Sequence, residues 1–193
     1  MQVDVQRYLD FLEDSGKFYF VDTESQGLEG DYGRLYVGSV KEFDGPTTTF
    51  YIGENFSDRG MVRDLKDKME EADAWVTFYG KGHDIPLINT RLARWGYKPL
   101  EQRHHIDMFY QLVRKLKTAR KSQAHLLEFL EDTMEILGLK VERKMTISPN
   151  VWSDLPTHYH RNIKILRDRC DSDVDGLKVL YQVTRGLIRD IKR

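Results

Sequence analysis

The sequence predicts an α/β fold in which helices flank a mixed five-stranded sheet. Three short β-type segments lie near the N-terminus with a tight turn signal between the second and third, which is typical of an antiparallel meander. Two later β-type segments each follow a helical segment, and crossover helices join parallel strands. The remainder is helical almost to the C-terminus. With 193 residues, we expect residues 1–193 to form a single domain.

The three antiparallel strands are expected at residues 17–21, 34–40 and 47–52. The first, KFYFV, is an aromatic and β-branched run that follows an amphipathic helical turn in VQRYLDFLED. The turn between the second and third lies in the segment Glu42-Phe-Asp-Gly-Pro46.

Over residues 57–71 the apolar residues recur with helical spacing, and Ser57 or Asp58 is the expected N-cap of this helix. A fourth strand is expected at 74–79, a helix with Asp84 as its N-cap over 84–95, and a fifth strand around 104–108. Beyond these, helices are predicted at 109–117, 123–137 and 159–192, with a looser segment at 146–157.

Composition excludes several classes of protein. Hydrophobic residues make up 40% of the chain, and only 5 residues are proline, which argues against disorder and low complexity. No apolar run approaches the ~18–20 residues of a membrane span, and acidic residues interrupt the N-terminal segment where a secretory signal would be apolar. We therefore expect a cytoplasmic location and no membrane contact. The single cysteine, Cys170, excludes an intramolecular disulfide and a thiolate zinc site.

The net charge of −1 hides an asymmetry. Residues 1–110 carry 13 Lys and Arg against 20 Asp and Glu, whereas residues 111–193 carry 17 against 11. Cation ligands in the first half and phosphate contacts in the second would explain the split. Two solvated surfaces of opposite sign are the simpler alternative.

Three short motifs contain acidic residues where chemistry is expected. Asp22 and Glu24 end the first strand, and because side chains alternate along a strand, both point to one face. Paired carboxylates favour a hard cation such as Mg²⁺ or Mn²⁺. Asp84 begins a helix directly after the fourth strand, where open α/β sheets bind ligands. Asp173 lies beside a packing face of the last helix. Taken singly, each has a simpler interpretation as a strand end, a helix cap or a surface acid.

Together the motifs VDTES, YGKGHDIPLI and RCDSDV resemble the DEDD (DnaQ-like) 3′–5′ exonucleases, which have a ribonuclease-H-like fold. The second motif is similar to the family pattern Asn-Gly-x-x-Phe-Asp-x-Pro, and His105-Ile-Asp107 resembles the His-x-Asp element of a branch of ribonuclease-H-like exonuclease domains. The resemblance implies four metal-binding carboxylates, Asp22, Glu24, Asp84 and Asp173. It also implies two-metal phosphodiester hydrolysis with Mg²⁺ or Mn²⁺, Asp22 bridging the ions and Glu24 orienting the water.

The sequence departs from the family at the general base. Members carry a tyrosine four residues, or a histidine five residues, before the last aspartate, but here these positions are Arg169 and Asp168. His83, His158 or His160 could supply a base, although such histidines are more often simply exposed. Asp171 is either an extra ligand or a surface acid.

Substrate contacts are suggested by basic and aromatic residues. The basic groups could hold phosphates or form solvated helix faces, and the aromatic residues could stack on bases or pack in the core. Gly80-Lys-Gly82 lacks the spacing of a phosphate loop. The basic candidates are Arg114, Lys115, Lys117, Arg120 and Lys121, then Arg161, Lys164, Arg167 and Arg169; the aromatic ones are Tyr79, Trp152 and Tyr159.

The sequence therefore predicts a metal-dependent 3′–5′ exonuclease that acts on single-stranded DNA or RNA ends. A catalytically weak or inactive member of the same fold that binds nucleic acid or a protein, and an endonuclease, are the alternatives.

Overall fold

A computed structural model describes residues 5–14, 16–140 and 145–189. Its sheet has five strands in the order β3-β2-β1-β4-β5. The first three strands pair antiparallel, and β4 and β5 extend the sheet in parallel with β1. The predicted mixed sheet is thus confirmed, with β1 at its centre. The strands are β1 (Phe18–Ser25), β2 (Leu35–Glu42), β3 (Thr47–Tyr51), β4 (Ala74–Thr77) and β5 (His104–Asp107).

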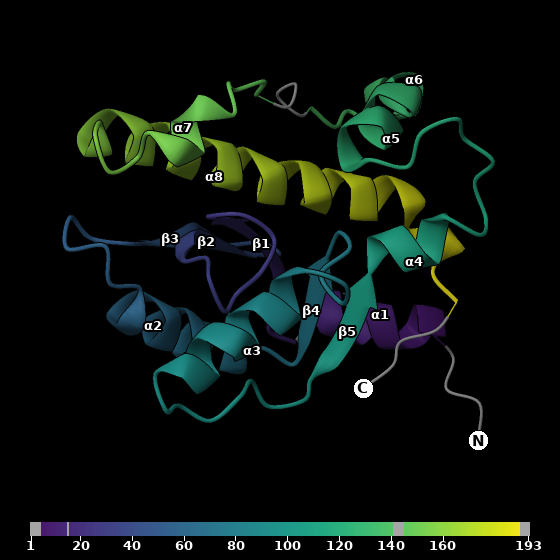
Figure 1. Cartoon of the computed structure of the whole chain (residues 1–193). Helices are drawn as coiled ribbons and strands as arrows, with labels where there is room; N and C mark the ends of the chain where they lie inside the picture. The colour runs from purple at the N-terminus through teal and green to yellow at the C-terminus, as the bar shows by residue number, and fades with distance from the viewer. Residues whose placement is uncertain (1–4, 15, 141–144, 190–193) are drawn as a thin grey trace.

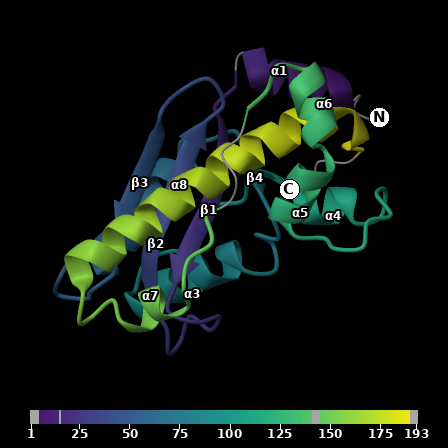
Figure 2. The ribbon, with the colours of Figure 1, turned by 90° about the horizontal axis from the view of Figure 1, so that it is seen from above.

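Helices cover both faces of this sheet (Figure 1). The longest, α8, crosses one face diagonally when the molecule is seen from above (Figure 2). On the opposite face lie α2 and α3, as shown in Figure 1. The helices are α1 (Val5–Asp14), α2 (Arg59–Glu70), α3 (Asp84–Arg94), α4 (Met108–Leu112), α5 (Gln123–Phe129), α6 (Glu131–Ile136), α7 (Asn150–Ser153) and α8 (Tyr159–Thr184), followed by the 3₁₀ turn η1 (Arg185–Leu187).

Alternating side chains of β1 supply two separate cores. Phe18 and Phe20 pack with α1 and α8, whereas Tyr19 and Val21 pack with α2 and α3. A third core joins β2, and Ile52 just after β3, to the N-terminal part of α8. Both faces of the central strand are therefore buried, which explains its nearly continuous apolar sequence. No helix among the described residues combines the length and apolar character needed to cross a bilayer.

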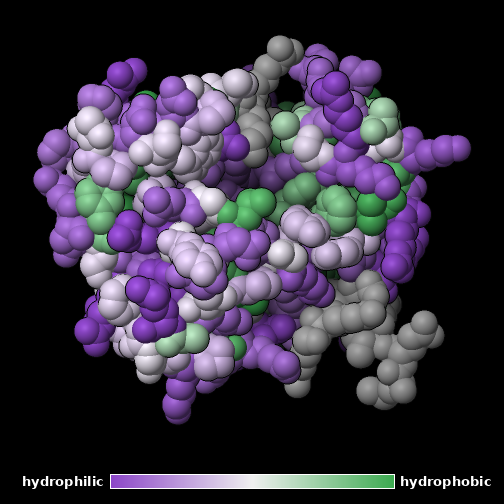
Figure 3. Space-filling model, viewed as in Figure 1, coloured by the Kyte–Doolittle hydropathy of each residue, from purple (hydrophilic) through white to green (hydrophobic). Residues whose placement is uncertain are grey.

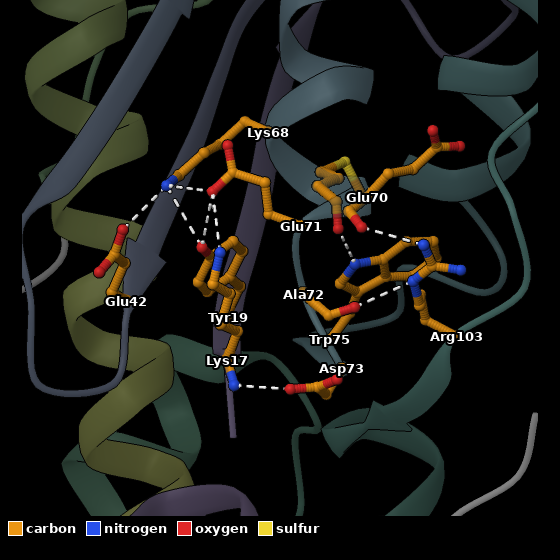
Figure 4. Close-up of polar contacts among 11 residues, drawn as sticks. Lys17, Tyr19, Glu42, Lys68, Glu70, Glu71, Ala72, Asp73, Trp75 and Arg103 are labelled. Atoms are coloured by element: carbon orange, nitrogen blue, oxygen red, sulfur yellow. Dashed lines mark hydrogen bonds and ion pairs between the residues drawn. The ribbon is translucent and has the colours of Figure 1, made fainter. Parts of the chain in front are cut away.

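Polar contacts fasten the end of the sheet where β1 and β4 begin (Figure 4). The Lys68 ammonium on α2 donates to Glu42 of β2, to the Tyr19 hydroxyl of β1 and to Glu71. Arg103, just before β5, donates to the carbonyl oxygens of Glu70 and Ala72. These bonds join the end of α2 to β1 and β2 and to the residue before β5. The candidate site lies at the opposite ends of β1 and β4, their carboxyl ends.

The structure corrects the sequence prediction in three helical regions. The helix predicted over 109–117 stops at Leu112, and the one predicted over 123–137 divides at Leu130 into α5 and α6. The helix predicted over 159–192 changes to a 3₁₀ turn after Thr184, and its last three residues lie outside the described part. The segment at 146–157 contains the short helix α7.

Candidate metal centre

Two elements bring three acidic side chains together. Asp22 and Glu24 lie on the face of β1 that α8 covers, and α8 contributes Asp173. Each of the three offers a carboxylate oxygen, and these oxygens all lie within 4.8 Å of one another. Glu24 and Asp173 are buried, and Asp22 is partly exposed. Residues 151 positions apart therefore meet because a long helix crosses the central strand.

The Glu24 carboxylate is held from both sides. Its Oε1 accepts a 2.6 Å hydrogen bond from Arg169 Nε, and its Oε2 accepts a 3.0 Å bond from the Trp152 indole N–H. Burial raises the pKa of Glu24, against the opposing effect of Arg169 and Trp152. Both partners lie far along the chain, and no short-range signal in the sequence indicates these contacts.

Arg169 lies among the acidic groups, at the position where the family pattern has a tyrosine. Its Nε lies 3.9 Å from Asp173 Oδ2, and its guanidinium carbon lies 5.4 Å from the centre of the Trp152 ring. Arg169 thus places a positive charge beside two of the acidic side chains, Glu24 and Asp173.

Asp84 is placed differently from the other three acids. It lies against the opposite face of β1, where the Thr23 hydroxyl donates a 2.5 Å hydrogen bond to its Oδ1. It is not part of the group within 4.8 Å, but it lines a cavity of about 580 Å³ together with Asp22. Burial raises the pKa of Asp84. The prediction that Asp84 caps its helix is wrong, since His83 occupies the N-cap position and Asp84 begins the helix.

The remaining candidates separate into those near the site and those away from it. His83 and Tyr79 line the same cavity as Asp22 and Asp84. His160 is exposed and lies 3.7 Å from Glu54, and His158 is the exposed N-cap residue of α8.

Asp171 and Tyr159 have structural partners. Asp171 accepts hydrogen bonds from Thr49 of β3 and from Ser39 of β2, which is the cross-strand partner of Asp22. The Tyr159 hydroxyl donates to the carbonyl oxygen of Ile52, and its ring contacts Phe56, so it packs rather than facing the site. Asp171 is thus excluded from the three-carboxylate group.

Cys170 is buried directly behind Asp22. Its thiol donates to the Asp22 carbonyl oxygen at 3.3 Å, and burial raises its pKa well above the usual value. A protonated, enclosed thiol is a poor nucleophile and a poor metal ligand. The chemistry of the site therefore depends on oxygen donors, which suit hard divalent cations such as Mg²⁺ and Mn²⁺.

Comparison with known proteins agrees with this geometry. A family model of the RNase H superfamily matches residues 19–153. The chain belongs to the RNase H superfamily. This confirms the resemblance at the level of superfamily and fold. The match includes Asp22, Glu24 and Asp84 but ends before α8, so Arg169 and Asp173 lie outside it.

A solved structure of this fold is the family B DNA polymerase from the hyperthermophilic archaeon Pyrobaculum calidifontis. The two share 16% sequence identity with a TM-score of 0.65, over 88% of this chain. The match covers only 24% of the polymerase chain, so it concerns the fold of one part of that protein. No curated protein matches this RNase H superfamily member in sequence.

Proposed function

We propose that this RNase H superfamily member is a metal-dependent 3′–5′ exonuclease that shortens single-stranded DNA or RNA. The observation that carries the proposal is the convergence of Asp22, Glu24 and Asp173 within 4.8 Å, in a fold that hydrolyses nucleic acids in other proteins. Asp84 shares a cavity with Asp22 and completes the proposed set of four carboxylates for two Mg²⁺ or Mn²⁺ ions.

Each side chain of the proposed site has its own role. Asp22, Glu24 and Asp173 would hold the cations, whose role is to activate water and to neutralise charge on the scissile phosphate. The Thr23 hydroxyl holds one carboxylate oxygen of Asp84, which lines the shared cavity. His83, which lines that cavity, is the proposed proton acceptor in place of the missing tyrosine or histidine.

The test is degradation of 5′-labelled single-stranded DNA and RNA oligonucleotides with Mn²⁺, Mg²⁺ or EDTA. A ladder that shortens from the 3′ end, and that disappears with EDTA and in Asp22→Ala and Asp173→Ala, is the expected result. Asp171→Asn is the matched control, because Asp171 is an acid on α8 that lies outside the three-carboxylate group, and asparagine can still accept from Ser39 and Thr49. Internal cuts would favour an endonuclease.

One observation favours a second candidate, a nucleic-acid-binding protein without hydrolytic activity. Both oxygens of Glu24 already accept hydrogen bonds, from Arg169 and Trp152. A cation must compete with Arg169 for this carboxylate, and a protein that keeps the ion pair would bind strands without cutting them. Oligonucleotide binding without cleavage under any metal, in wild type and variants alike, would support this candidate over the exonuclease.

A further inference from the structure

The loop after β4 has a strained and well-supported backbone. Tyr79 has a φ of 66°, which non-glycine residues rarely adopt, and its side chain is 43% exposed. A Cβ on Gly82 would lie 2.5 Å from the Tyr79 ring, so only glycine allows the ring to lie this close. An exposed aromatic ring held at the cost of backbone strain suggests a binding role.

The His-x-Asp element of β5 holds this loop in place. The Asp107 carboxylate accepts hydrogen bonds from the backbone N–H groups of Tyr79 and Lys81, both at 2.9 Å. His105 bonds to Thr77 at 2.8 Å, and the Thr77 hydroxyl accepts from the N–H of Gly80. Asp107 and His105 are themselves almost fully buried. They act as positioning residues for the loop that carries Tyr79.

A basic cavity of about 550 Å³ adjoins the loop. Among the described residues, four cationic side chains line it together with one carboxylate, Asp107, which is 1% exposed and bonded to backbone N–H groups. Residues 187–189 lie beside it, since Lys115 donates to the carbonyl oxygen of Leu187 and the Arg189 N–H donates to Gln111. The cationic residues are Lys81, Arg114, Lys115 and Arg189.

Aromatic rings connect this cavity with the carboxylate cavity. Tyr79 lines the cavity of Asp22 and Asp84, and its ring lies 5.9 Å from that of Tyr110, which lines the basic cavity. Figure 1 shows α4, which carries Tyr110, at the carboxyl end of β5 and below the end of α8. In the space-filling view of the same side, apolar and neutral side chains gather near α4 within a mostly hydrophilic face (Figure 3).

The geometry points to a single-strand-binding patch made of Tyr79, Lys81, Tyr110, Arg114, Lys115 and Arg189. It would bind the sugar-phosphate backbone through the cations and stack bases on the two exposed tyrosines. This inference rests on the proposed function, because the patch would guide a bound nucleic-acid strand toward the proposed cleavage site at Asp22. A paired duplex hides its base faces, so the patch favours unpaired nucleotides.

Binding of a short 5′-fluorescein-labelled single-stranded DNA, followed by anisotropy in EDTA so that metal-dependent cleavage is absent, tests the patch. Arg114→Gln and Arg189→Gln should each weaken binding several-fold. Each should also reduce the slope of log K against log [salt] by about 0.7 for every phosphate contact that is lost. Tyr110→Leu should weaken binding about tenfold with little change in that slope. Arg120→Gln is the control, since Arg120 belongs to the same basic run but does not line the cavity.

Two results separate the patch from the exonuclease proposal. If the three patch variants bind like Arg120→Gln, the patch is refuted, whatever Asp22→Ala does to cleavage. If they lose binding while wild type cleaves nothing with any metal, the patch stands and the exonuclease proposal fails.

Discussion

At the scale of single residues, Arg169 occupies the position that most distinguishes this site. Its guanidinium contacts Glu24 and lies 3.9 Å from Asp173, so it neutralises part of the acidic group when no other cation is bound. The same charge repels an incoming divalent ion. We therefore expect Arg169 to stabilise the metal-free protein and to weaken metal binding at the proposed site.

We predict that Arg169→Gln lowers the stability of the protein in EDTA by about 1–3 kcal/mol, because a charged hydrogen bond to a buried carboxylate is lost. We also expect Mn²⁺ affinity to rise by about tenfold, or ~1.4 kcal/mol. That gain is smaller than the ~4 kcal/mol between unit charges 4 Å apart at an effective dielectric constant of about 20. Thermal unfolding with and without Mn²⁺ measures both effects.

Arg161→Gln is the control for this experiment, because Arg161 is an exposed arginine on the same helix. It should behave like the wild type in both conditions. Weaker Mn²⁺ binding by Arg169→Gln would show instead that Arg169 organises the carboxylates for the metal.

His83 is the second residue whose role is open to a direct test. It lines the cavity of Asp22 and Asp84, whereas His160 is exposed beside Glu54. If His83 accepts the proton, His83→Gln should lower kcat by about 10²-fold or more with little change in KM. His160→Gln should leave both unchanged. Equal activities of the two variants, measured on single-stranded oligonucleotides, would exclude His83 as the base.

At the scale of elements, a buried ion pair fixes α3 against the start of β2. Asp58 is 0% exposed and accepts hydrogen bonds from Arg91 Nε at 2.7 Å, Arg91 Nη2 at 2.9 Å, Trp95 Nε1 at 2.8 Å and the Leu35 N–H at 3.0 Å. Arg91 also donates to the carbonyl oxygen of Gly30. Since α3 begins with Asp84, this anchor also positions one acid of the proposed site.

We predict that Asp58→Asn destabilises the fold by about 3–5 kcal/mol, because it leaves the Arg91 charge buried without a counter-charge. Chemical denaturation should show the loss as a lower midpoint with an unchanged slope. Asp64→Asn removes the exposed ion pair with Arg63 and should cost no more than about 1 kcal/mol. Similar losses in the two variants would contradict the anchoring role.

The elements also show what could be predicted from the sequence and why. β1 was predicted because its apolar pattern matches its burial, and α1 extends over the ten residues in which an amphipathic helical turn was predicted. The break between α5 and α6 at Leu130 was not predicted, because no glycine or proline marks it in the sequence. Both helices contact α8, and such tertiary contacts are not visible in a local pattern. Ser57 or Asp58 was predicted as the N-cap of α2, and Asp58 occupies that position, but its carboxylate binds Arg91 across the fold and makes no cap bond.

The same distinction applies to the site. The alternation of a strand predicts that Asp22 and Glu24 share a face, and the structure places them so. The contacts of Glu24 with Trp152 and Arg169 join residues more than a hundred positions apart, and only the packing of α7 and α8 over β1 produces them. The sequence showed that position 169 departs from the family pattern, but it did not indicate that the Arg169 side chain binds the Glu24 carboxylate. The metal-binding role of all four acids remains a prediction.

At the scale of the whole molecule, the charge asymmetry of the chain has a spatial counterpart. The acidic first part supplies Asp22, Glu24 and Asp84, while the basic second part supplies Arg114, Arg169 and Arg189. Folding brings the two parts together, so the carboxylate cavity adjoins the basic one through Tyr79 and Tyr110. A nearly neutral protein thereby carries the proposed cation site beside the proposed phosphate-binding patch. Net charge alone indicated neither.

The stability of the whole fold should depend on pH through His105. Burial, with a smaller contribution from Lys81, lowers the pKa of His105 to about 3 from a usual 6.5. As the pH falls below 6.5, the unfolded chain binds a proton that the folded one does not, so stability decreases until the pH reaches the folded pKa. Between pH 6.5 and about 5 the loss attributable to this residue is about 2 kcal/mol.

Chemical denaturation of wild type and His105→Gln across this range isolates the contribution, because glutamine can still bond to Thr77 and does not titrate. The comparison is needed because Glu24, Asp84 and Asp107 have raised pKa values and act in the opposite direction as they gain protons. As the pH falls below 6.5, the free energy of unfolding of the wild type should decrease relative to that of the variant. The slope of this decrease is at most about 1.4 kcal/mol per pH unit. Parallel curves for the two proteins would mean that His105 becomes protonated in the folded state, and that the β5 support of the Tyr79 loop is more open to water than its burial indicates.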